Sequence, residues 1–561
     1  MKNSLFSGML LIVSVFFSFS FAEAAGPYHS WEVISIPFKS TKAYQNPYAD
    51  VSATSGKDLL KVTFNGTSGD ASGKTITIVG FWNGGEEWKV NFAAPVAGRW
   101  NYVSSSSDRS MNGKKGNFEV LPWTEDEKKS NPTRHGFVRV KKDGLLPGHF
   151  FEYSDGKPFL WIGDTWWNWT NNRIKPETFR QMVDDRSEKG FTIGQLFVPG
   201  NGWGRPSSLL DETYLILDTV HASKVERMIR YANSKGITVW IHGWWSRENM
   251  AKNIGPEKMQ RWWRYLVHRL SAYNVVWVLA GEYNMYNYGG FPLDFWKGLG
   301  NLVKAEDPYE RIVGVHNTPP FWDGGADAPQ WGTGSVLHSE PWLDYNQIQV
   351  GHGRYANEMI PLVVSEEYSG MPAKPVVVTE PWYEFIEGNP TGLDIRFAAW
   401  SAILSGAAGH TYGGGHVWLA SVPEAPGGGG SWPYEKGFER TTYDYEGAVS
   451  MKHLAAFFSN IEWWKMAPHP GLLKEYPQPF CLADPGKEYV LYLRYGGVVK
   501  LAMDTEAASG TYMYKWYNPG TGKYYGERKI KGSDVLSFSC PESYPAVVDF
   551  RDWVLHVKRL E

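Results

Sequence analysis

From residue 27 to about residue 122, apolar and polar positions alternate in short runs, the pattern of strands with one buried face. Turn residues such as Asn83-Gly84-Gly85 separate the runs. Several short strands at this spacing predict an antiparallel β-sandwich, which we assign to residues 26–123. The strand candidates are residues 59–66, 74–82, 87–95, 99–107 and 116–123. Residues 123–134 are charged and contain a proline, as a linker would.

The middle of the chain changes to apolar strands that alternate with helical patterns. One of these patterns, residues 222–236, has apolar Val225, Met228, Ile229 and Ala232 at helical spacing and ends at Gly236. Eight strand-then-helix units predict an α/β fold, a (β/α)8 TIM barrel over residues 124–455. A doubly wound open sheet is the alternative, but no Gly-rich phosphate fingerprint follows the first strand. The strand candidates are residues 158–167, 191–200, 236–245, 274–284, 311–320, 344–353, 374–383 and 408–418.

The end of the chain, residues 456–561, returns to strand patterns with Asn-Pro-Gly and Gly-Gly turns. A second antiparallel β-sandwich is predicted there. This segment also holds the chain's two cysteines, Cys481 and Cys540. A structural disulfide between them and two free thiols remain equal alternatives.

The N-terminus has the pattern of a secretory signal. Lys2 precedes an apolar run from Leu5 to Phe21, and Ala22-Glu23-Ala24 supplies a small-x-small cleavage site. The run is shorter than the roughly 20 residues of a spanning helix, which disfavours a membrane anchor. We predict a cleaved signal peptide over residues 1–25, and hence a secreted or periplasmic protein with no membrane partner after cleavage.

Composition narrows the choice of partner. The 56 basic and 59 acidic side chains nearly balance, which argues against nucleic acid. Aromatic residues are abundant, with 28 Trp, 31 Tyr and 28 Phe, and many Trp stand beside polar residues or glycine, as in "GDTWWNW". Apolar rings beside hydrogen-bonding groups suit the binding of sugars. Neither a cofactor nor an oligomeric state is indicated.

Polar and aromatic residues gather at the predicted strand ends, which meet at one mouth in a barrel. Glu282 and Glu380 end the fourth and seventh strands after apolar runs, so they can face each other as glycosidic-bond cleavage requires. A metal site at His316, His338, Glu340 and His352 is a weaker alternative without a ligand motif. The other predicted substrate-binding residues are Asp164, Trp166, Trp167, His242, Trp244, Asn284, His316, Asn317, His352, Trp382, Tyr383, His410 and Tyr412.

Four motifs, "GKPFLWIGDTWW", "QVGHG", "KPVVVTEPWYE" and "IRFAAWSAILSGAAGHTYGGG", together resemble the apiosidase-like catalytic domain of glycoside hydrolase family 140 and its relatives. The resemblance covers most of residues 135–455, and the flanking segments look like the sandwiches that often accompany this domain. It implies a retaining mechanism with Glu282 as acid/base and Glu380 as nucleophile. Two positions depart from the pattern: Glu282 stands where near relatives often carry Asp, and Gly281 where many related enzymes carry Asn.

The sequence therefore predicts a glycoside hydrolase that acts on plant or algal polysaccharides or their oligosaccharides. Trp166, Trp167, Trp244 and Trp382 are expected to line its sugar subsites. A non-catalytic carbohydrate-binding or adhesion protein on a degenerate barrel is the alternative. The pair of carboxylates distinguishes the two, because a binding protein has no need of it.

Overall fold

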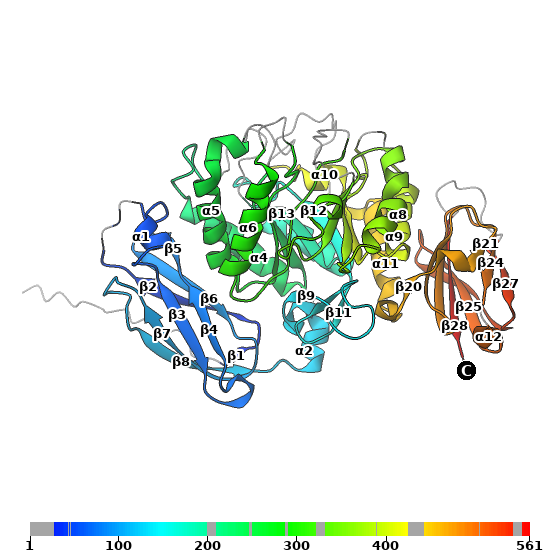
Figure 1. Cartoon of the computed structure of the whole chain (residues 1–561), viewed down its shortest axis with the longest axis horizontal. Coiled ribbons are helices and arrows are strands. Elements are labelled where there is room, and N and C mark those ends of the chain that lie inside the picture. The colour runs from blue at the N-terminus through cyan, green and yellow to red at the C-terminus, as the bar shows by residue number, and fades with distance from the viewer. Residues whose placement is uncertain are drawn as a thin grey trace, which may run out of the picture.

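The computed structural model describes residues 27–42, 44, 46–198, 209–245, 250–285, 290–320, 331–386, 388, 390–424, 443–503, 505–541 and 552–560. The predicted signal peptide lies outside these residues. Within them, no helix combines the length and the apolar character that a bilayer span requires. Three parts follow one another along the chain: a β-sandwich, a parallel barrel with its helices, and a second β-sandwich (Figure 1).

The N-terminal part is the predicted sandwich of two sheets. One sheet has the order β1-β8-β7-β3-β4 and the other β2-β6-β5. Alternate residues of both sheets point into a shared core, where the rings of Phe64 and Phe92 stack 3.9 Å apart beside buried Trp100. The strands are β1 (Tyr28–His29), β2 (Val33–Lys39), β3 (Lys61–Gly66), β4 (Thr75–Val79), β5 (Phe81–Gly84), β6 (Glu87–Ala93), β7 (Gly98–Ser105) and β8 (Lys115–Leu121), with the short helix α1 (Val51–Thr54) between β2 and β3.

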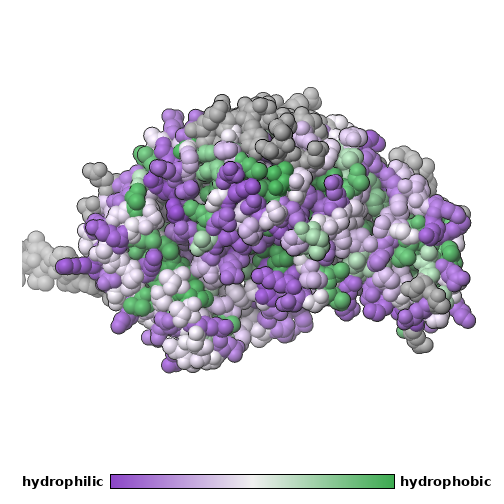
Figure 2. All heavy atoms as spheres, in the orientation of Figure 1, coloured by the Kyte–Doolittle hydropathy of each residue, from purple (hydrophilic) through white to green (hydrophobic). Residues whose placement is uncertain are grey.

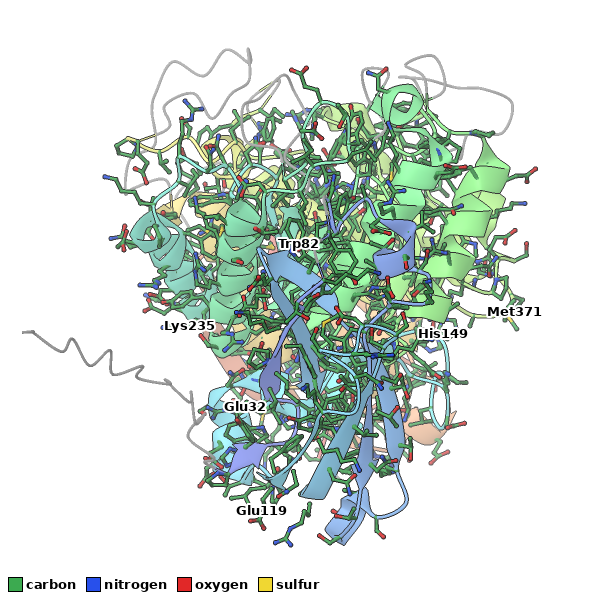
Figure 3. All side chains as sticks on the ribbon, turned by 90° about the vertical axis from the view of Figure 1, so that its left-hand side faces the viewer. Glu32, Trp82, Glu119, His149, Lys235 and Met371 are labelled. Atoms are coloured by element: carbon green, nitrogen blue, oxygen red, sulfur yellow. The ribbon has the colours of Figure 1, made fainter. Side chains whose placement is uncertain are left out.

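This sandwich packs directly on the barrel. Figure 3, which looks onto it, shows Trp82 at the end of the sandwich that meets the barrel helices. Tyr48 is buried there, with its ring 5.6 Å from that of Tyr265 on α5 (Met250–Leu270). Asn91 donates a hydrogen bond to the carbonyl of Arg269 at 2.9 Å. Buried contacts of this kind fix the two parts relative to each other.

The expected linker is partly helical. Residues Glu125–Ser130 form α2, and a 3₁₀ turn at Pro132–His135 follows. A capping box starts the helix, because the Thr124 hydroxyl accepts from the Glu127 N–H while the Glu127 carboxylate accepts from the Thr124 N–H. The sequence T-E-D-E carries this signal, so the predicted linker contains a short capped helix that the sequence analysis did not anticipate.

The barrel has the eight predicted parallel strands in the order β16-β15-β14-β13-β12-β19-β18-β17. Neighbours in the sheet are neighbours in sequence, apart from the β12–β19 pair that joins the first and last strands. This order confirms the TIM barrel and excludes the doubly wound sheet, in which the strand order reverses. The strands are β12 (Trp161–Trp166), β13 (Ile193–Phe197), β14 (Thr238–His242), β15 (Val275–Val278), β16 (Val313–Gly314), β17 (Asn346–Gln349), β18 (Val376–Glu380) and β19 (Gly409–Tyr412).

Helices surround the barrel, and a small sheet precedes it. β9 (Val138–Val140), β10 (Phe151–Tyr153) and β11 (Pro158–Phe159) form this small sheet on the side where the barrel strands begin (Figure 1). The face in Figure 2 is a mosaic in which hydrophilic residues prevail, as expected for a surface that meets water. The helices are α3 (Pro176–Glu188), α4 (Thr219–Ser234), α5, α6 (Leu293–Glu306), α7 (Gly334–Leu337), α8 (Arg354–Tyr368), α9 (Gly392–Leu404), α10 (Gly415–Trp418) and α11 (Glu446–Phe458).

The C-terminal part is the second predicted sandwich. Its sheets have the orders β20-β22-β23-β28-β25-β26 and β21-β24-β27. The elements are β20 (Ala467–Pro468), β21 (Leu473–Lys474), β22 (Phe480–Asp484), β23 (Glu488–Leu493), β24 (Val498–Ala502), α12 (Thr505–Ala508), β25 (Thr511–Asn518), β26 (Lys523–Lys531), β27 (Val535–Ser539) and β28 (Trp553–Arg559).

The two cysteines of this part form no disulfide with each other, so the disulfide alternative does not hold. Cys481 is buried in β22 of the larger sheet, whereas Cys540 follows β27 of the other sheet and accepts from the Gly497 N–H at 3.0 Å. Burial raises the pKa of the Cys481 thiol to about 12, which makes it unreactive.

The C-terminal sandwich is joined to the barrel through α9. Every residue of this helix, from Gly392 to Leu404, is buried, except Leu393, which is half-buried. The helix therefore has no solvent-facing side. The helix lies beneath β22 and β23, where Trp400 stacks with Tyr492. Arg396 is fully buried, and its Nε lies 2.9 Å from Asp552 Oδ2 at the start of β28. This ion pair makes the second sandwich part of the barrel's own packing.

Candidate active site

A β-bulge decides which way Glu380 points. Val376 and Val378 pack outward against α8 and α9, while Val377 belongs to the barrel interior, so strict alternation would turn Glu380 outward. The register with β17 shifts here: Ile348 pairs with Val378, but Gln349 pairs with Glu380. Thr379 is therefore the extra residue of a bulge, and Glu380 is turned to the inner face.

Glu380 is held between two imidazoles. It is buried, and His316 Nε2 lies 3.1 Å from its Oε2 while His352 Nε2 lies 3.4 Å from its Oε1. Burial alone would raise the pKa of Glu380, but the two histidines outweigh it and hold the pKa at about 2. Glu380 is therefore an ionised carboxylate at neutral pH.

Glu282 contacts β17, the strand that pairs with the strand of Glu380. Its Oε2 accepts a hydrogen bond from the Trp245 indole at 2.9 Å, and its Oε1 accepts from Gln349 Nε2 at 3.4 Å. Since Gln349 is also the register partner of Glu380, the two carboxylates belong to one side-chain cluster. Glu282 has φ +48°, a strained left-handed conformation of the kind that occurs at functional sites.

Aromatic rings enclose the cluster. Trp167 donates its indole N–H to the Tyr383 hydroxyl at 3.2 Å, and its ring lies 5.1 Å from that of His242. Tyr383 also packs against His352, with ring centroids 4.6 Å apart. Burial and the Glu380 carboxylate raise the pKa of Tyr383, and burial beside His316 lowers that of His242, so both are neutral.

Two predicted substrate-binding residues of the first strand lie outside this cluster. Asp164 accepts from Trp166 Nε1 at 3.0 Å and from Arg186 Nε on α3 at 2.7 Å, with both charged groups fully buried. The Trp166 ring packs against Phe179 of the same helix. The prediction that both contact substrate is not supported by these positions, because their side chains leave β12 toward the helices.

The eighth strand shows the same orientation. His410 and Tyr412 pair with Ile162 and Asp164, so they share the outer face of the barrel. Burial lowers the pKa of His410 to about 3, and the Tyr412 hydroxyl donates to Glu384 at 2.7 Å. These two residues therefore also lie away from Glu282 and Glu380, contrary to the sequence prediction.

The remaining predicted residues support the mouth or are packed beside it. Asn284 accepts from the Thr318 N–H at 2.8 Å, and Asn317 donates to the Trp331 carbonyl at 3.0 Å, so both tie loops together. Trp244 packs on Tyr214, and Trp382 is 3% exposed within the barrel core. Of the four tryptophans expected to line sugar subsites, Trp167 is the one that these contacts connect to the carboxylates.

Two residues of the cluster, Trp245 and Gln349, were not among the predicted site residues. Trp245 stands at a strand end, and Gln349 alternates with Gln347 along a buried strand, which is an unusual place for amides. The structure also explains Gly281, because a Cβ there would lie 2.4 Å from His242 Cε1 and 2.5 Å from Trp245 Cε3. The space that a side chain before Glu282 would need is filled by these two rings.

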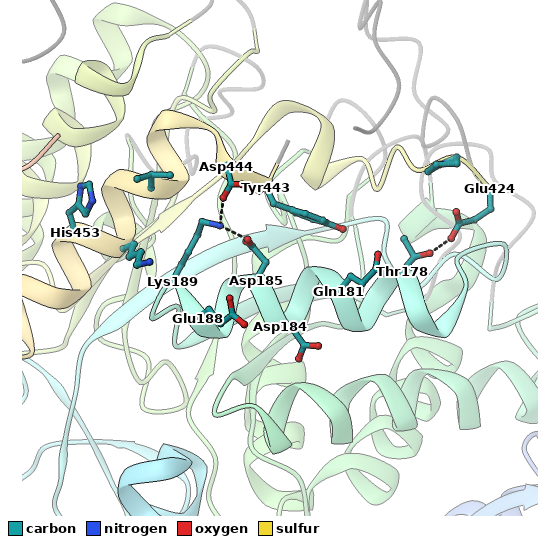
Figure 4. Close-up of a pocket in the computed structure, with 13 residues that line it drawn as sticks. Thr178, Gln181, Asp184, Asp185, Glu188, Lys189, Glu424, Tyr443, Asp444 and His453 are labelled. Atoms are coloured by element: carbon teal, nitrogen blue, oxygen red, sulfur yellow. Dashed lines mark hydrogen bonds and ion pairs between the residues drawn. The ribbon is translucent and has the colours of Figure 1, made fainter. Parts of the chain in front are cut away.

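A separate hollow of about 810 Å³ lies on the flank of the barrel between α3 and the start of α11 (Figure 4). Lys189, at the end of α3, pairs with Asp185 one turn earlier and with Asp444. Neither Glu282 nor Glu380 lines it. Among the described residues no group of three or more His, Cys, Asp or Glu is arranged to hold a metal ion, and His338 instead contacts Asn346 and the Pro372 carbonyl.

Comparison with known families identifies the barrel. The model of the "Apiosidase-like, catalytic domain" matches residues 147–465, which is more than half of the chain. The chain belongs to the apiosidase-like family. This apiosidase-like protein is a glycoside hydrolase, as the resemblance of its motifs implied. A search of curated proteins found no match.

The flanking parts of the apiosidase-like protein match two further family models. A domain of unknown function, DUF5060, covers residues 27–107, and a "Putative collagen-binding domain of a collagenase" covers residues 475–558. Both matches fall within the predicted sandwiches.

Solved structures share the fold of the apiosidase-like protein at low sequence identity. A "putative glycoside hydrolase" from Bacteroides vulgatus is 20% identical with a TM-score of 0.69, and the match covers 95% of this chain and all 100% of that one. A glycoside hydrolase family 5 structure from the same organism is 19% identical with a TM-score of 0.64, covering 76% and 94% of the two chains. The first of these matches extends over all three parts of the chain.

Proposed function

We propose that this apiosidase-like protein is a retaining glycoside hydrolase that cleaves plant or algal polysaccharides or their oligosaccharides after secretion. Glu380 is the nucleophile and Glu282 the acid/base. The observation that carries this assignment is the environment of Glu380. A carboxylate that attacks an anomeric carbon must be ionised and fixed, and two imidazoles hold Glu380 in that state inside the barrel.

In the first step, a Glu380 oxygen bonds to the anomeric carbon as the bond from that carbon to the leaving oxygen breaks. Glu282 gives its proton to the leaving oxygen, so the aglycone departs as an alcohol. His316 and His352 keep the attacking carboxylate oriented before it reacts. Trp245 and Gln349 donate to Glu282 and fix its two oxygens.

In the second step, Glu282, now ionised, takes a proton from water, and the water oxygen attacks the anomeric carbon. The bond from that carbon to Glu380 breaks, which frees both the sugar and the carboxylate. The donors to Glu282 suit this step, because an indole N–H and an amide N–H stabilise its ionised form. Two inversions at the anomeric carbon give overall retention.

The proposal is tested with a panel of 4-nitrophenyl furanosides and pyranosides and of plant and algal polysaccharides. On the first substrate found, the anomer of the initial product is read by proton NMR. We then expect Glu380→Ala to lose turnover at least a thousandfold and to regain it with azide as a glycosyl azide. Glu282→Gln is expected to retain activity mainly on substrates whose leaving group needs no proton.

Release of the inverted anomer would contradict the retaining mechanism. Turnover of Glu380→Ala near that of the wild type would remove Glu380 from the nucleophile role. If the wild type hydrolyses nothing on the panel but binds glycans as well as the double Glu→Gln variant does, the binding-protein alternative holds instead.

A further inference from the structure

Glu384 lies four residues after Glu380 and is buried, with 2% of its surface exposed. Its main chain continues the barrel pairing, because its N–H donates to the Gly413 carbonyl at 2.9 Å and its carbonyl accepts from the Gly415 N–H at 2.7 Å. Neighbouring side chains on such a strand-like segment point to opposite faces. Tyr383 accordingly enters the mouth, and Glu384 enters the layer between the barrel and its helices.

The carboxylate of Glu384 is held by two donors from distant parts of the chain. The Tyr412 hydroxyl at the end of β19 donates to its Oε2 at 2.7 Å. The N–H of Gly447, in the first turn of α11, contacts its two oxygens at 3.0 and 3.1 Å. The residues at these three positions connect the segment after β18 to the eighth strand and to a helix that follows it.

The packing around this connection leaves no spare space. A Cβ on Gly447 would lie 2.5 Å from Glu384 Oε2, and a Cβ on Gly413 would lie 2.1 Å from Tyr383 Cδ1. Both values are far below ordinary contact distances. A displacement of Glu384 would therefore move Tyr383, whose hydroxyl accepts from Trp167 and whose ring packs on His352.

We propose that Glu384 is a positioning residue, which holds Tyr383 in the mouth and through it the surroundings of the Glu380 carboxylate. The inference rests on the proposed role of Glu380 as the nucleophile. The contacts of the Glu384 carboxylate with Tyr412 and Gly447 lie outside the mouth, so its effect on the reaction passes through Tyr383.

The test uses the full chain and three variants that loosen the connection from different sides: Glu384→Gln, Tyr412→Phe and Gly447→Ala. The first readout needs no substrate. It is the proton–nitrogen resonance of the Trp167 indole, identified as the signal missing in Trp167→Phe. We expect all three variants to shift this signal. Glu358→Gln, which breaks the ion pair with Arg494 at the C-terminal junction, is the matched control and should leave it unchanged.

The second readout is the kinetics on the 4-nitrophenyl glycoside that the panel identifies. We expect kcat to fall about tenfold with KM within threefold, and Glu384→Gln to be affected least because its amide oxygen still accepts one hydrogen bond. An unchanged Trp167 signal in folded Glu384→Gln and Gly447→Ala would overturn the proposal. Tyr412→Phe keeps the ring and removes one oxygen, so it decides the matter if the other two do not fold.

These measurements distinguish a failure of the positioning role of Glu384 from a failure of the proposed function. A shifted Trp167 signal in a protein that hydrolyses no glycoside would support the positioning role and reject the proposed function. Normal hydrolysis by all three variants, with Trp167 unmoved, would reject the positioning role alone.

Discussion

Replacing His316 by Phe tests how the chain keeps Glu380 ionised inside the barrel. His316 is fully buried 3.1 Å from Glu380 Oε2, whereas His352 is 18% exposed and 3.4 Å away. Phenylalanine preserves most of the ring volume but removes the nitrogen. Burial then acts on the carboxylate with one imidazole fewer, and the pKa of Glu380 should rise.

The magnitude follows from the pKa. A fall from 4.5 to about 2 is roughly 2.5 pH units, which is about 3 kcal/mol in favour of the ionised form. Since the folded-state pKa of Glu380 is depressed, this stabilisation is fully present above the unfolded pKa near 4.5 and is lost as the pH falls toward 2. Because burial acts in the opposite direction, the two histidines together contribute more than this net value, and we assign about 2 kcal/mol to His316, which is nearer and more deeply buried.

The assay is the free energy of unfolding in urea, followed by tryptophan fluorescence, for the wild type, His316→Phe, Glu380→Gln and the double variant. This cycle isolates the coupling of the pair. We expect a coupling of about 2 kcal/mol at pH 7 and a smaller coupling of about 1.2 kcal/mol at pH 3. Equal coupling at both pH values, or none at pH 7, would refute the reasoning.

Three further predictions concern residues that the structure relocates or explains. Asp164→Asn removes one of the anions that pair with the buried Arg186, so we expect the free energy of unfolding in urea to fall by about 3–5 kcal/mol. The kcat/KM of the folded variant should stay within threefold of the wild type. A large rise in KM without lost stability would show instead that Asp164 binds substrate. Gly281→Ala should lower the free energy of unfolding by about 1–3 kcal/mol and kcat at least tenfold, because its methyl group displaces Trp245 from Glu282. Normal activity of this variant would show that the space beside Gly281 is not as tightly filled as described. His410 has a pKa depressed to about 3, so the unfolded chain takes up its proton first and stability falls as the pH drops below about 6.5. The change in the free energy of unfolding caused by His410→Leu should therefore be about 2 kcal/mol more favourable at pH 5 than at pH 8. The same change at both pH values would contradict this prediction.

The architecture could be predicted because each of its signals is local. Eight apolar runs separated by helical patterns sufficed for the barrel, and short alternating runs sufficed for the sandwiches. The helix over Glu125–Ser130 was missed because its charged residues read as a linker, although its capping box is visible in the sequence. In that segment the terminal hydrogen bonds outweigh the absence of an apolar stripe.

The site was predicted in part, and the limit is one of orientation. A polar residue at a strand end shows where the backbone reaches the mouth but not which face its side chain takes. Asp164 and His410 stand at strand ends and point toward the helices. Glu380 would point there as well without the bulge at Thr379, which no periodicity reveals. Gln349 was missed for another reason: its alternation with Gln347 marks one face of β17 as polar, but an amide does not by itself indicate which chemistry that face performs.

The burial of α9 has a consequence for the order in which the chain acquires its structure during synthesis. The helix is complete at Leu404, but Tyr492 and Asp552, which cover it and neutralise Arg396, lie much farther along the chain. Until those residues leave the ribosome, Arg396 lacks the Asp552 carboxylate and has Glu446 of α11 as its partner, and the last barrel unit lacks its outer layer. We therefore expect the outer packing of the last barrel unit to be completed only at the end of translation, and a chain that terminates early to be captured by chaperones or proteases rather than to yield a smaller working enzyme.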